Sequence, residues 1–256
     1  MSGQKDREKR REERLAEESK VDTVDRRKRL LQMAAGAVFL VVVAVVVVIV
    51  AGSSGGSDGS GDTKLEEVAA VEKLLTGIPQ EGLVLGKSSA PVELIEFGDL
   101  QCPICKEYSE EILPEVIDNK VKSGEAKIDF RNFTIISEES KPAGAAAIAA
   151  GEQGLGWSYI ELFYRNQGEE RSGYVTDEFM TSIAKGAGVK DIAQWNKVRK
   201  EPKTTKEVEA TNAEAQKFGF NGTPSFAIKG PGTNGIELLG TLQSPGEFEE
   251  AIDAAS

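Results

Sequence analysis

The chain has 256 residues, two cysteines and no histidine. Without histidine it cannot form, on its own, a Ser-His-Asp triad, a His-Glu-x-x-His zinc site or a Cys-His protease site. Its formal net charge is −11, and residues 52–256 hold 20 Lys/Arg against 34 Asp/Glu. Nucleic-acid-binding domains normally carry basic patches, so a domain this acidic argues against nucleic-acid binding.

The first 51 residues predict a charged tail followed by a membrane anchor. Residues 1–29 mix 11 Lys/Arg with 8 Asp/Glu, as solvated tails do, and residues 30–51 hold no charged side chain. Within this uncharged segment, Met33–Ala51 would span about 28 Å as a helix, close to the ~30 Å hydrocarbon thickness of a bilayer. A cleaved signal peptide is the alternative, but its apolar core is usually only about 7–15 residues long.

The charges beside this segment predict its orientation. Four basic residues, Arg26–Arg29, immediately precede it, and positive charge near a span favours the cytoplasmic side. We therefore expect a single-pass protein of the bacterial plasma membrane, with a cytoplasmic N-terminus and an extracytoplasmic C-terminal domain. Residues 52–63 are rich in Gly and Ser and predict a flexible linker, and residues 64–256 then form the exported domain.

The first part of the domain predicts a β-α-β unit. The strand is expected at Val92–Phe97, its helix at Pro103–Lys122 and the next strand at Ile128–Phe133. Strand, helix and strand in this order indicate two parallel strands joined by a right-handed crossover. Pro114 should kink the helix or divide it. A short helix at Leu65–Leu75 and a short strand at Leu83–Leu85 are expected before this unit.

Both cysteines lie at the predicted start of the helix that follows the strand Val92–Phe97, in the motif Cys102-Pro103-Ile104-Cys105. Thiols at this spacing can close a disulfide, and a helix N-terminus stabilises a thiolate, so the motif indicates thiol–disulfide exchange. A structural disulfide is one alternative, but so small a ring removes little entropy from the unfolded chain. A zinc site is another, but it needs about four ligands and would have to be shared between molecules.

Helical patterns dominate residues 140–217, and a hairpin and a last helix follow. The aromatic residues Trp157, Phe163, Phe179 and Trp195 are expected in the core of the helical block. Thr176 is expected to cap the third helix. The predicted helices are Ala143–Ala150, Trp157–Asn166, Thr176 to about Gly186, Asp191–Lys200 and Thr204–Phe218; the hairpin strands are Ser225–Ile228 and Ile236–Leu239; and the last helix is Pro245–Ala254.

Three features together resemble the DsbA-like branch of the thioredoxin superfamily. They are the strand that delivers the Cys-x-x-Cys motif to a helix, the Gly222–Phe226 segment with its Thr-Pro pair, and the helical block between them. The resemblance covers roughly residues 83–255. It implies an α/β thioredoxin-like fold with an inserted helical domain at about 140–217, preceded here by the N-terminal transmembrane helix.

The resemblance also implies roles for individual residues. Cys102 would be the exposed nucleophile and Cys105 the less exposed partner that closes the disulfide. Pro224 would follow a cis peptide bond, and the backbone of Thr223 would pair with the bound substrate chain.

Three further residues are expected to tune this site. Glu96 lies six residues before the first cysteine, where the superfamily places an acid; we expect it to be buried and to relay a proton to or from Cys105. A solvated carboxylate without a role is the alternative. Pro103 and Ile104 should tune the redox potential. Enterobacterial DsbA proteins have Pro-His here, and Ile104 cannot stabilise a thiolate as an imidazole can, which leaves the oxidising strength open.

The resulting prediction is a membrane-anchored oxidase that introduces disulfides into exported cysteine-containing proteins. The two sulfurs carry the chemistry, so neither a cofactor nor a metal is implied. A membrane redox partner would reoxidise the protein, which we expect to be a monomer. Two alternatives remain: a reductase or isomerase that uses the same site in the other direction, and a tethered binding or chaperone module without turnover.

Overall fold

The computed structural model describes residues 65–256. The predicted tail at 1–29, anchor at 30–51 and linker at 52–63 therefore lie outside the described residues. Within residues 65–256, no helix is both long and apolar enough to cross a membrane.

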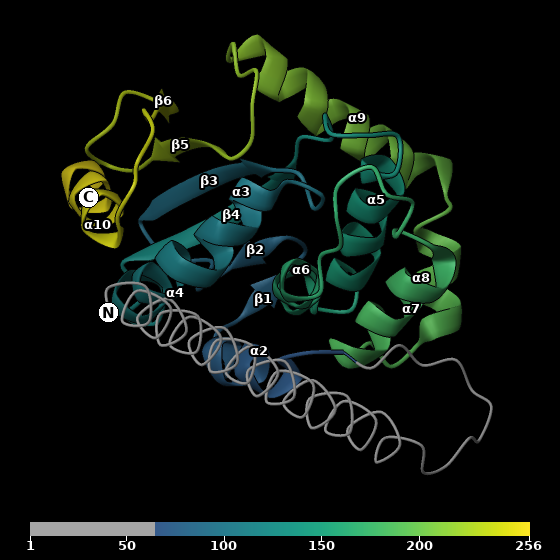
Figure 1. Cartoon of the computed structure of the whole chain (residues 1–256). Helices are drawn as coiled ribbons and strands as arrows, with labels where there is room; N and C mark the ends of the chain where they lie inside the picture. Colours follow the sequence, from purple (N-terminus) through teal and green to yellow (C-terminus); the bar gives the residue numbers. More distant parts are fainter. Residues whose placement is uncertain (1–64) are drawn as a thin grey trace, which may run out of the picture. The chain divides into compact units, whose positions relative to one another are not determined.

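The strands of residues 65–256 form one six-stranded sheet in the order β1-β2-β4-β3-β5-β6 (Figure 1). β3 and β4 pair in parallel, as predicted for the β-α-β unit, and all other neighbours pair antiparallel. β3 is central, because it pairs with β4 on one side and with β5 on the other. The strands are β1 (Gln80–Glu81), β2 (Val84–Leu85), β3 (Val92–Gly98), β4 (Ala126–Asn132), β5 (Ser225–Lys229) and β6 (Glu237–Leu238).

The crossover from β3 to β4 is one helical segment that changes its pitch around a proline. It consists of α3 (Pro103–Glu107), the π-helical turn η1 (Tyr108–Ile112), α4 (Leu113–Val116) and a second π-helical turn, η2 (Ile117–Val121). Pro114 lies in the first turn of α4. A proline lacks the N–H of an ordinary helical bond and clashes with the preceding turn, so a wider turn before it relieves the clash. The predicted break at Pro114 is therefore present as a change of helix type.

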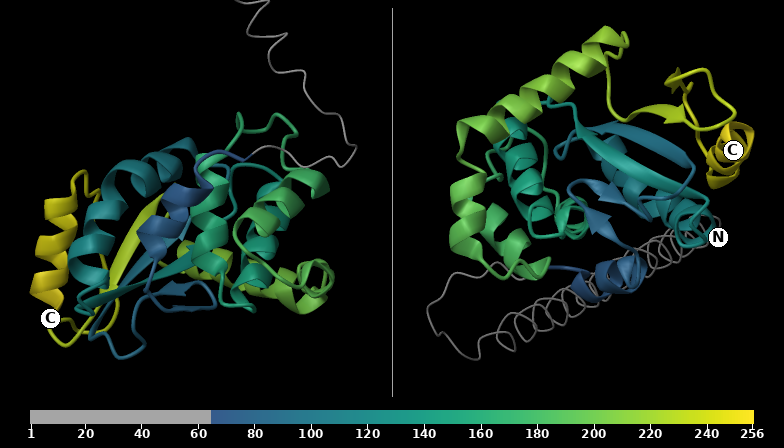
Figure 2. Two further views of the ribbon diagram at one scale, coloured as in Figure 1. Left: turned by 90° about the horizontal axis from the view of Figure 1, so that it is seen from below. Right: turned by 180° about the vertical axis from the view of Figure 1, so that it is seen from behind.

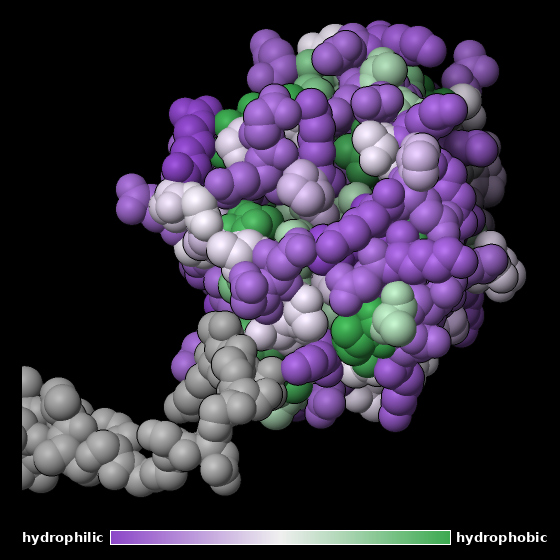
Figure 3. Space-filling view, turned by 90° about the vertical axis from the view of Figure 1, so that its right-hand side faces the viewer, coloured by the Kyte–Doolittle hydropathy of each residue, from purple (hydrophilic) through white to green (hydrophobic). Residues whose placement is uncertain are grey.

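The helical insertion lies between β4 and β5 and stands beside the sheet (Figure 1, teal to light green). α9 runs along α5 and reaches β4, which returns the chain to the sheet (Figure 2). Hydrophilic side chains cover most of the face in Figure 3, as expected for helices that bury their apolar faces. The insertion comprises α5 (Ser140–Gly151), α6 (Gly156–Arg165), α7 (Asp177–Gly186), α8 (Ile192–Val198) and α9 (Pro202–Lys217).

The two faces of β3 are buried against different elements. Val92 and Leu94 belong to the main core, which also contains Cys105. Ile95 and Phe97 face a second cluster with Ala215, near the end of α9. This alternation follows from the pleat of a strand. It places the side chain of Glu96 on the same face of the sheet as the helix that carries the cysteines.

The remaining elements complete the cover of the sheet. α10 (Pro245–Ala255) packs against α4 and β5, and α2 (Val68–Leu75) packs against α6. Most predicted elements are present with ends shifted by one to three residues. The two-residue strand β1 was not predicted, and Phe179 is only partly buried at the edge of the core where Trp157, Phe163 and Trp195 are fully buried.

Candidate active site

The loop after β3 places Cys102 immediately before the first turn of a helix. Cys102 is the N-cap of α3, and Pro103 occupies the first turn, where its missing N–H costs nothing. Asp99 shapes this loop: one carboxylate oxygen accepts from the Gln101 amide at 2.9 Å. The other accepts from the backbone amides of Ile135 at 2.8 Å and Ile136 at 2.9 Å, which fastens the loop to the segment after β4. Asp99 therefore has a structural role.

Gly98, the last residue of β3, allows close packing beneath this loop. A Cβ there would lie 2.5 Å from a ring carbon of Phe130 and 3.1 Å from the hydroxyl of Tyr164. That hydroxyl donates to the Asp99 carbonyl at 3.3 Å. A side chain at position 98 would displace both rings, so the loop depends on this glycine.

Cys102 is much less exposed than predicted. Only 4% of the residue is accessible, because the Thr223 carbonyl lies 3.3 Å from its sulfur on one side, and the protonated thiol donates to that carbonyl. From its own helix, the Cys105 amide donates to the sulfur at 3.4 Å. The expectation of an exposed nucleophile is wrong for this state, in which both thiols are free.

The environment lowers the pKa of the Cys102 thiol to about 6. The main cause is the hydrogen bond that the Cys105 thiol donates to the Cys102 thiolate. The backbone amides of Cys105 and Ile104 at the start of α3 act in the same direction, and burial opposes them. At neutral pH the first sulfur is therefore largely ionised.

Cys105 has the opposite character. It is fully buried, and burial raises the pKa of its thiol well above the ordinary value. Donating to Cys102 and lying near its charge and that of Glu96 raise it further. When a disulfide between the two cysteines opens at Cys102, the sulfur of Cys105 must therefore take up a proton.

Glu96 is buried, as predicted. Its exposed fraction is 1%, and its Oε1 has no hydrogen-bond partner within the described residues. Burial raises its pKa to about 8, with further contributions from the nearby charges of Glu161 and Cys102. A carboxyl group in this condition is mostly protonated at neutral pH. It can donate a proton to a neighbouring thiolate.

The loop before β5 faces the cysteines. The Thr223–Pro224 peptide bond is cis, as the resemblance implied, and the Thr223 carbonyl is the group that contacts Cys102. Of the two residues between the cysteines, Pro103 is exposed and Ile104 is 49% accessible. Ile104 thus presents an apolar side chain to solvent beside the reactive sulfur.

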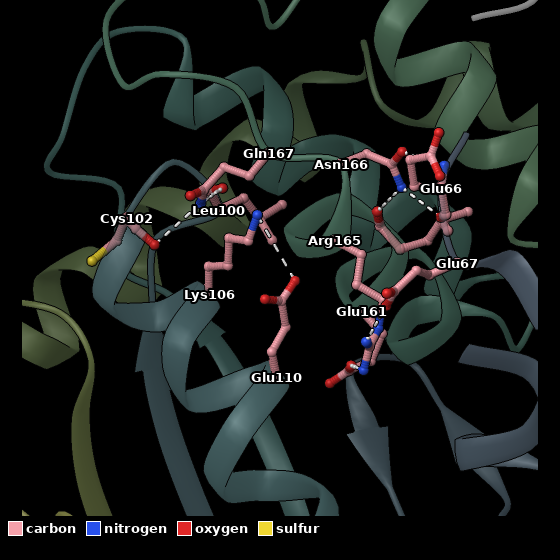
Figure 4. A network of polar contacts seen from close by, with 11 residues as sticks. Glu66, Glu67, Leu100, Cys102, Lys106, Glu110, Glu161, Arg165, Asn166 and Gln167 are labelled. Atoms are coloured by element: carbon pink, nitrogen blue, oxygen red, sulfur yellow. Dashed lines mark hydrogen bonds and ion pairs between the residues drawn. The ribbon is translucent and has the colours of Figure 1, made fainter. Parts of the chain in front are cut away.

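The insertion contributes groups to the site that the sequence did not reveal. Gln167, just after α6, donates from its side-chain amide to the carbonyls of Leu100 at 2.8 Å and Cys102 at 3.1 Å (Figure 4). Gln101, fully buried, donates to Ser137 at 2.6 Å and to Ser140, in α5, at 3.0 Å. Hydrogen bonds from the start of α5 and from the region just after α6 therefore hold the cysteine loop in place.

A second buried acid, Glu161 on α6, acts electrostatically on Glu96. It has no accessible surface, and burial raises its pKa to about 7, while Arg165 opposes the rise. The guanidinium of Arg165 is 3.4 Å from one of its oxygens (Figure 4). The burial of Glu161 could have been predicted from the sequence of α6. Apolar or aromatic residues occupy most positions around this helix, which is typical of a helix that is buried on all sides.

The comparisons with known proteins agree with this geometry. The profile of the family described as "Thioredoxin" matches residues 79–254. The chain belongs to the thioredoxin family. A probable disulfide bond formation protein D of Bacillus anthracis is 30% identical over 149 residues, which cover 57% of this chain and 69% of that protein.

Two solved structures have the same fold. Oxidised BdbD from Bacillus subtilis matches with a TM-score of 0.59 and 24% identity, covering 69% of this chain and 95% of that one. Wolbachia pipientis alpha-DsbA1 matches with a TM-score of 0.59 and 20% identity, covering 72% and 94%. This member of the thioredoxin family is a DsbA-like thiol–disulfide oxidoreductase, with a helical insertion in the thioredoxin-like fold.

Proposed function

We propose that the protein is a membrane-anchored oxidase that donates a Cys102–Cys105 disulfide to exported cysteine-containing proteins. The opposite displacement of the two thiol pKa values carries this proposal: lowered to about 6 for Cys102, raised for Cys105. Stabilising the Cys102 thiolate favours the reduced form. A disulfide whose reduced form is stabilised is a stronger oxidant.

The reaction then follows from the geometry. A substrate thiolate attacks the Cys102 sulfur and forms a mixed disulfide, and Cys105 leaves as a thiolate that takes a proton from Glu96. A second substrate thiolate attacks the substrate sulfur of the mixed disulfide, which releases oxidised substrate and the Cys102 thiolate. The two electrons gained by the protein pass to a membrane redox partner during reoxidation.

Substrate binding is proposed for the surface around Cys102. The backbone of Thr223, held by the cis bond to Pro224, would pair with an extended substrate chain. Such pairing tolerates many sequences. The exposed side chain of Ile104 would contact apolar substrate residues. Pro103 and Ile104 tune the potential by fixing the start of α3, whose amides point toward Cys102.

The location of the protein is also part of the proposal. The uncharged residues 30–51, preceded by Arg26–Arg29, support a single-pass anchor in the plasma membrane with the domain of residues 64–256 outside. That side of the membrane permits disulfides. A monomer suffices, because both cysteines and the facing loop come from one chain.

The test is to incubate the oxidised full-length chain, purified in detergent micelles, with reduced, unfolded ribonuclease. Wild type should restore ribonuclease activity, whereas Cys102→Ser and Cys105→Ser, neither of which can close the disulfide, should restore none. Equilibration of wild type in glutathione buffers should give a potential nearer to about −120 mV than to about −270 mV. A potential at the low end would instead indicate a reductase, and full activity of Cys102→Ser a binding module.

A further inference from the structure

Two buried polar atoms without hydrogen-bond partners, Glu96 Oε1 on β3 and Arg165 Nε on α6, belong to one group of interacting side chains. Glu161 on α6 connects them, because it acts electrostatically on Glu96 and contacts Arg165. The Ser109 hydroxyl on η1 donates a hydrogen bond to Glu161. Buried polar atoms are normally paired, so a cluster of this kind points to a function beyond packing.

The charges of this cluster do not balance if every group is ionised. The Nη1 of Arg165 is 2.7 Å from Glu67, which is half-exposed, whereas its Nη2 is 3.4 Å from Glu161. Glu110 also acts on Glu161, and its own partner is Lys106 at 3.8 Å. Arg165, the cation that contacts Glu161, is thus shared with a surface carboxylate.

The groups around Glu96 do not supply compensating positive charge either. The ionisable side chains that face it or lie near it are Cys102, Cys105, Tyr164 and Glu161, and none of these is cationic. A buried carboxylate without a close cation is costly. At least one of the two buried glutamates must therefore be protonated in the folded protein.

We propose that Glu161 is a second proton-carrying carboxyl group, which connects Glu96 to solvent at the surface beside Arg165. Arg165 lies where this path reaches solvent, because its side chain is 11% accessible and that of its ion-pair partner Glu67 is 55% accessible. Glu161 does not touch the sulfurs and acts through Glu96. The inference rests on the thiol–disulfide exchange proposed for Cys102 and Cys105.

The proton steps balance as follows. When a substrate thiolate opens the disulfide, the electron pair of the broken S–S bond goes to Cys105, and the proton of Glu96 neutralises this thiolate. Glu96 is then a carboxylate and takes the proton of Glu161. Glu161 recovers a proton from water at the Arg165 end. During reoxidation the same proton returns to solvent by the reverse steps.

The order of proton affinities supports this direction of transfer. The pKa of Glu161 is raised to about 7, that of Glu96 to about 8, and that of Cys105 well above its ordinary value. Both carboxyl groups can therefore hold a proton near neutral pH, and the sulfur of Cys105 holds one more tightly than either. If Glu161 only anchored α6 by an ion pair, it would remain a carboxylate, and replacing it would remove no protonated-carboxyl signal.

The experiment uses the full chain in detergent micelles and compares wild type with Glu161→Gln. The oxidised protein is mixed with a small dithiol, and free thiols are counted after an acid quench across a pH series. Glu161→Gln removes a negative neighbour, so the pKa of Glu96 should fall. The inflection of the pH–rate profile should move down by about one pH unit, making the reaction about tenfold slower above the inflection. Glu111→Gln, which removes an exposed carboxyl group from η1, is the matched control and should leave the profile unchanged.

Redox-difference infrared spectroscopy provides a second readout that a structural role would not move. Wild type should show two protonated-carboxyl bands that change on reduction, and Glu161→Gln should lack one of them. Arg165→Met removes the opposing cation, so the Glu161 band should persist to higher pH. This variant also decides the question if Glu161→Gln does not fold.

The outcomes separate this inference from the proposed function. An active wild type with an unchanged inflection in Glu161→Gln, or a spectrum in which no band depends on Glu161, overturns the relay and leaves the oxidase intact. A wild type that fails to oxidise ribonuclease overturns the proposed function itself. A shifted inflection together with a lost band supports the relay.

Discussion

The sheet with α3 and the helical insertion contribute different chemistry to one site. β3 and α3 hold both sulfurs and Glu96, and the segment before β5 brings the Thr223 carbonyl to 3.3 Å from Cys102. The insertion holds neither cysteine. It supplies the side-chain amide of Gln167 to the cysteine loop and the buried carboxyl of Glu161, which acts electrostatically on Glu96.

This difference shows that the active site of a thioredoxin-like fold can be modified by residues of an inserted segment. The helix N-terminus that lowers the pKa of Cys102 follows from the order of strand and helix alone. The groups that fix the loop and surround Glu96 come from a segment distant in sequence. We therefore propose that the first region determines which reaction occurs, and that the insertion sets the rigidity of the cysteine loop and the pH dependence of the reaction. Three substitutions, ordered by expected effect, test this division.

Replacing Glu96 by Gln should have the largest effect, because it removes the group that we propose as the proton donor for Cys105. Loss of a general acid typically slows the step that it assists by about a hundredfold or more. We expect this for opening of the disulfide by a dithiol at pH 7, whereas alkylation of Cys102 by iodoacetamide should change little. A Glu96→Gln variant as fast as wild type would exclude the relay role of Glu96.

The same variant should change the pH dependence of stability. The folded-state pKa of Glu96 is raised from 4.5 to about 8, so between these values the folded state keeps a proton that the unfolded state has lost. The contribution of Glu96 to stability is thus full below pH 4.5 and lost as the pH rises to about 8. Reduced Glu96→Gln should therefore lose less stability than wild type between pH 5 and 8. Urea unfolding followed by the fluorescence of Trp157 and Trp195 measures this.

A smaller effect is expected from Gln167→Leu, which tests whether the insertion acts on the site at all. The buried Leu100 carbonyl loses its donor, whereas the Cys102 carbonyl keeps the Lys106 amide. We expect about 1–2 kcal/mol lower stability and a change of a few-fold in the iodoacetamide reactivity of Cys102.

Gln153→Leu is the matched control for this comparison. Gln153 exchanges two hydrogen bonds with the backbone of Asp191, within the insertion and away from the cysteines. It should lower stability by a similar amount without altering the reactivity of Cys102. Equal reactivity in Gln167→Leu and wild type would show that the insertion only covers the site.

The sheet part of this arrangement was predictable because its signals are local. The apolar run at Val92–Phe97 and the cysteines at the following helix start predicted β3 and the start of α3 to within one residue. The placement of Glu96 followed from the two-residue period of a strand. These features depend on backbone geometry and on residues close together in sequence.

The parts that escaped prediction depend on contacts between distant residues. β1 has only two residues and no apolar alternation; Gln80 is held there by accepting from the amides of Trp157 and Ser158 in α6. The hydrogen bonds of Gln167 and the burial of Cys102 likewise arise only when the insertion and the segment before β5 fold against α3. Hydrophobic periodicity carries no information about such polar contacts.

The smallest effect should come from Thr176→Ala, which weakens the insertion at a point remote from the cysteines. Thr176 was predicted as a helix cap, and its hydroxyl accepts from the Phe179 amide at 3.1 Å at the start of α7. Loss of such a cap typically costs about 1 kcal/mol. We expect that loss in urea unfolding, with no change in the pKa of Cys102 measured by alkylation. Thr176→Ser keeps the hydroxyl and should retain most of the stability. A shifted pKa of Cys102 in Thr176→Ala would mean that the whole insertion, rather than Gln167 and Glu161, sets the electrostatics of the site.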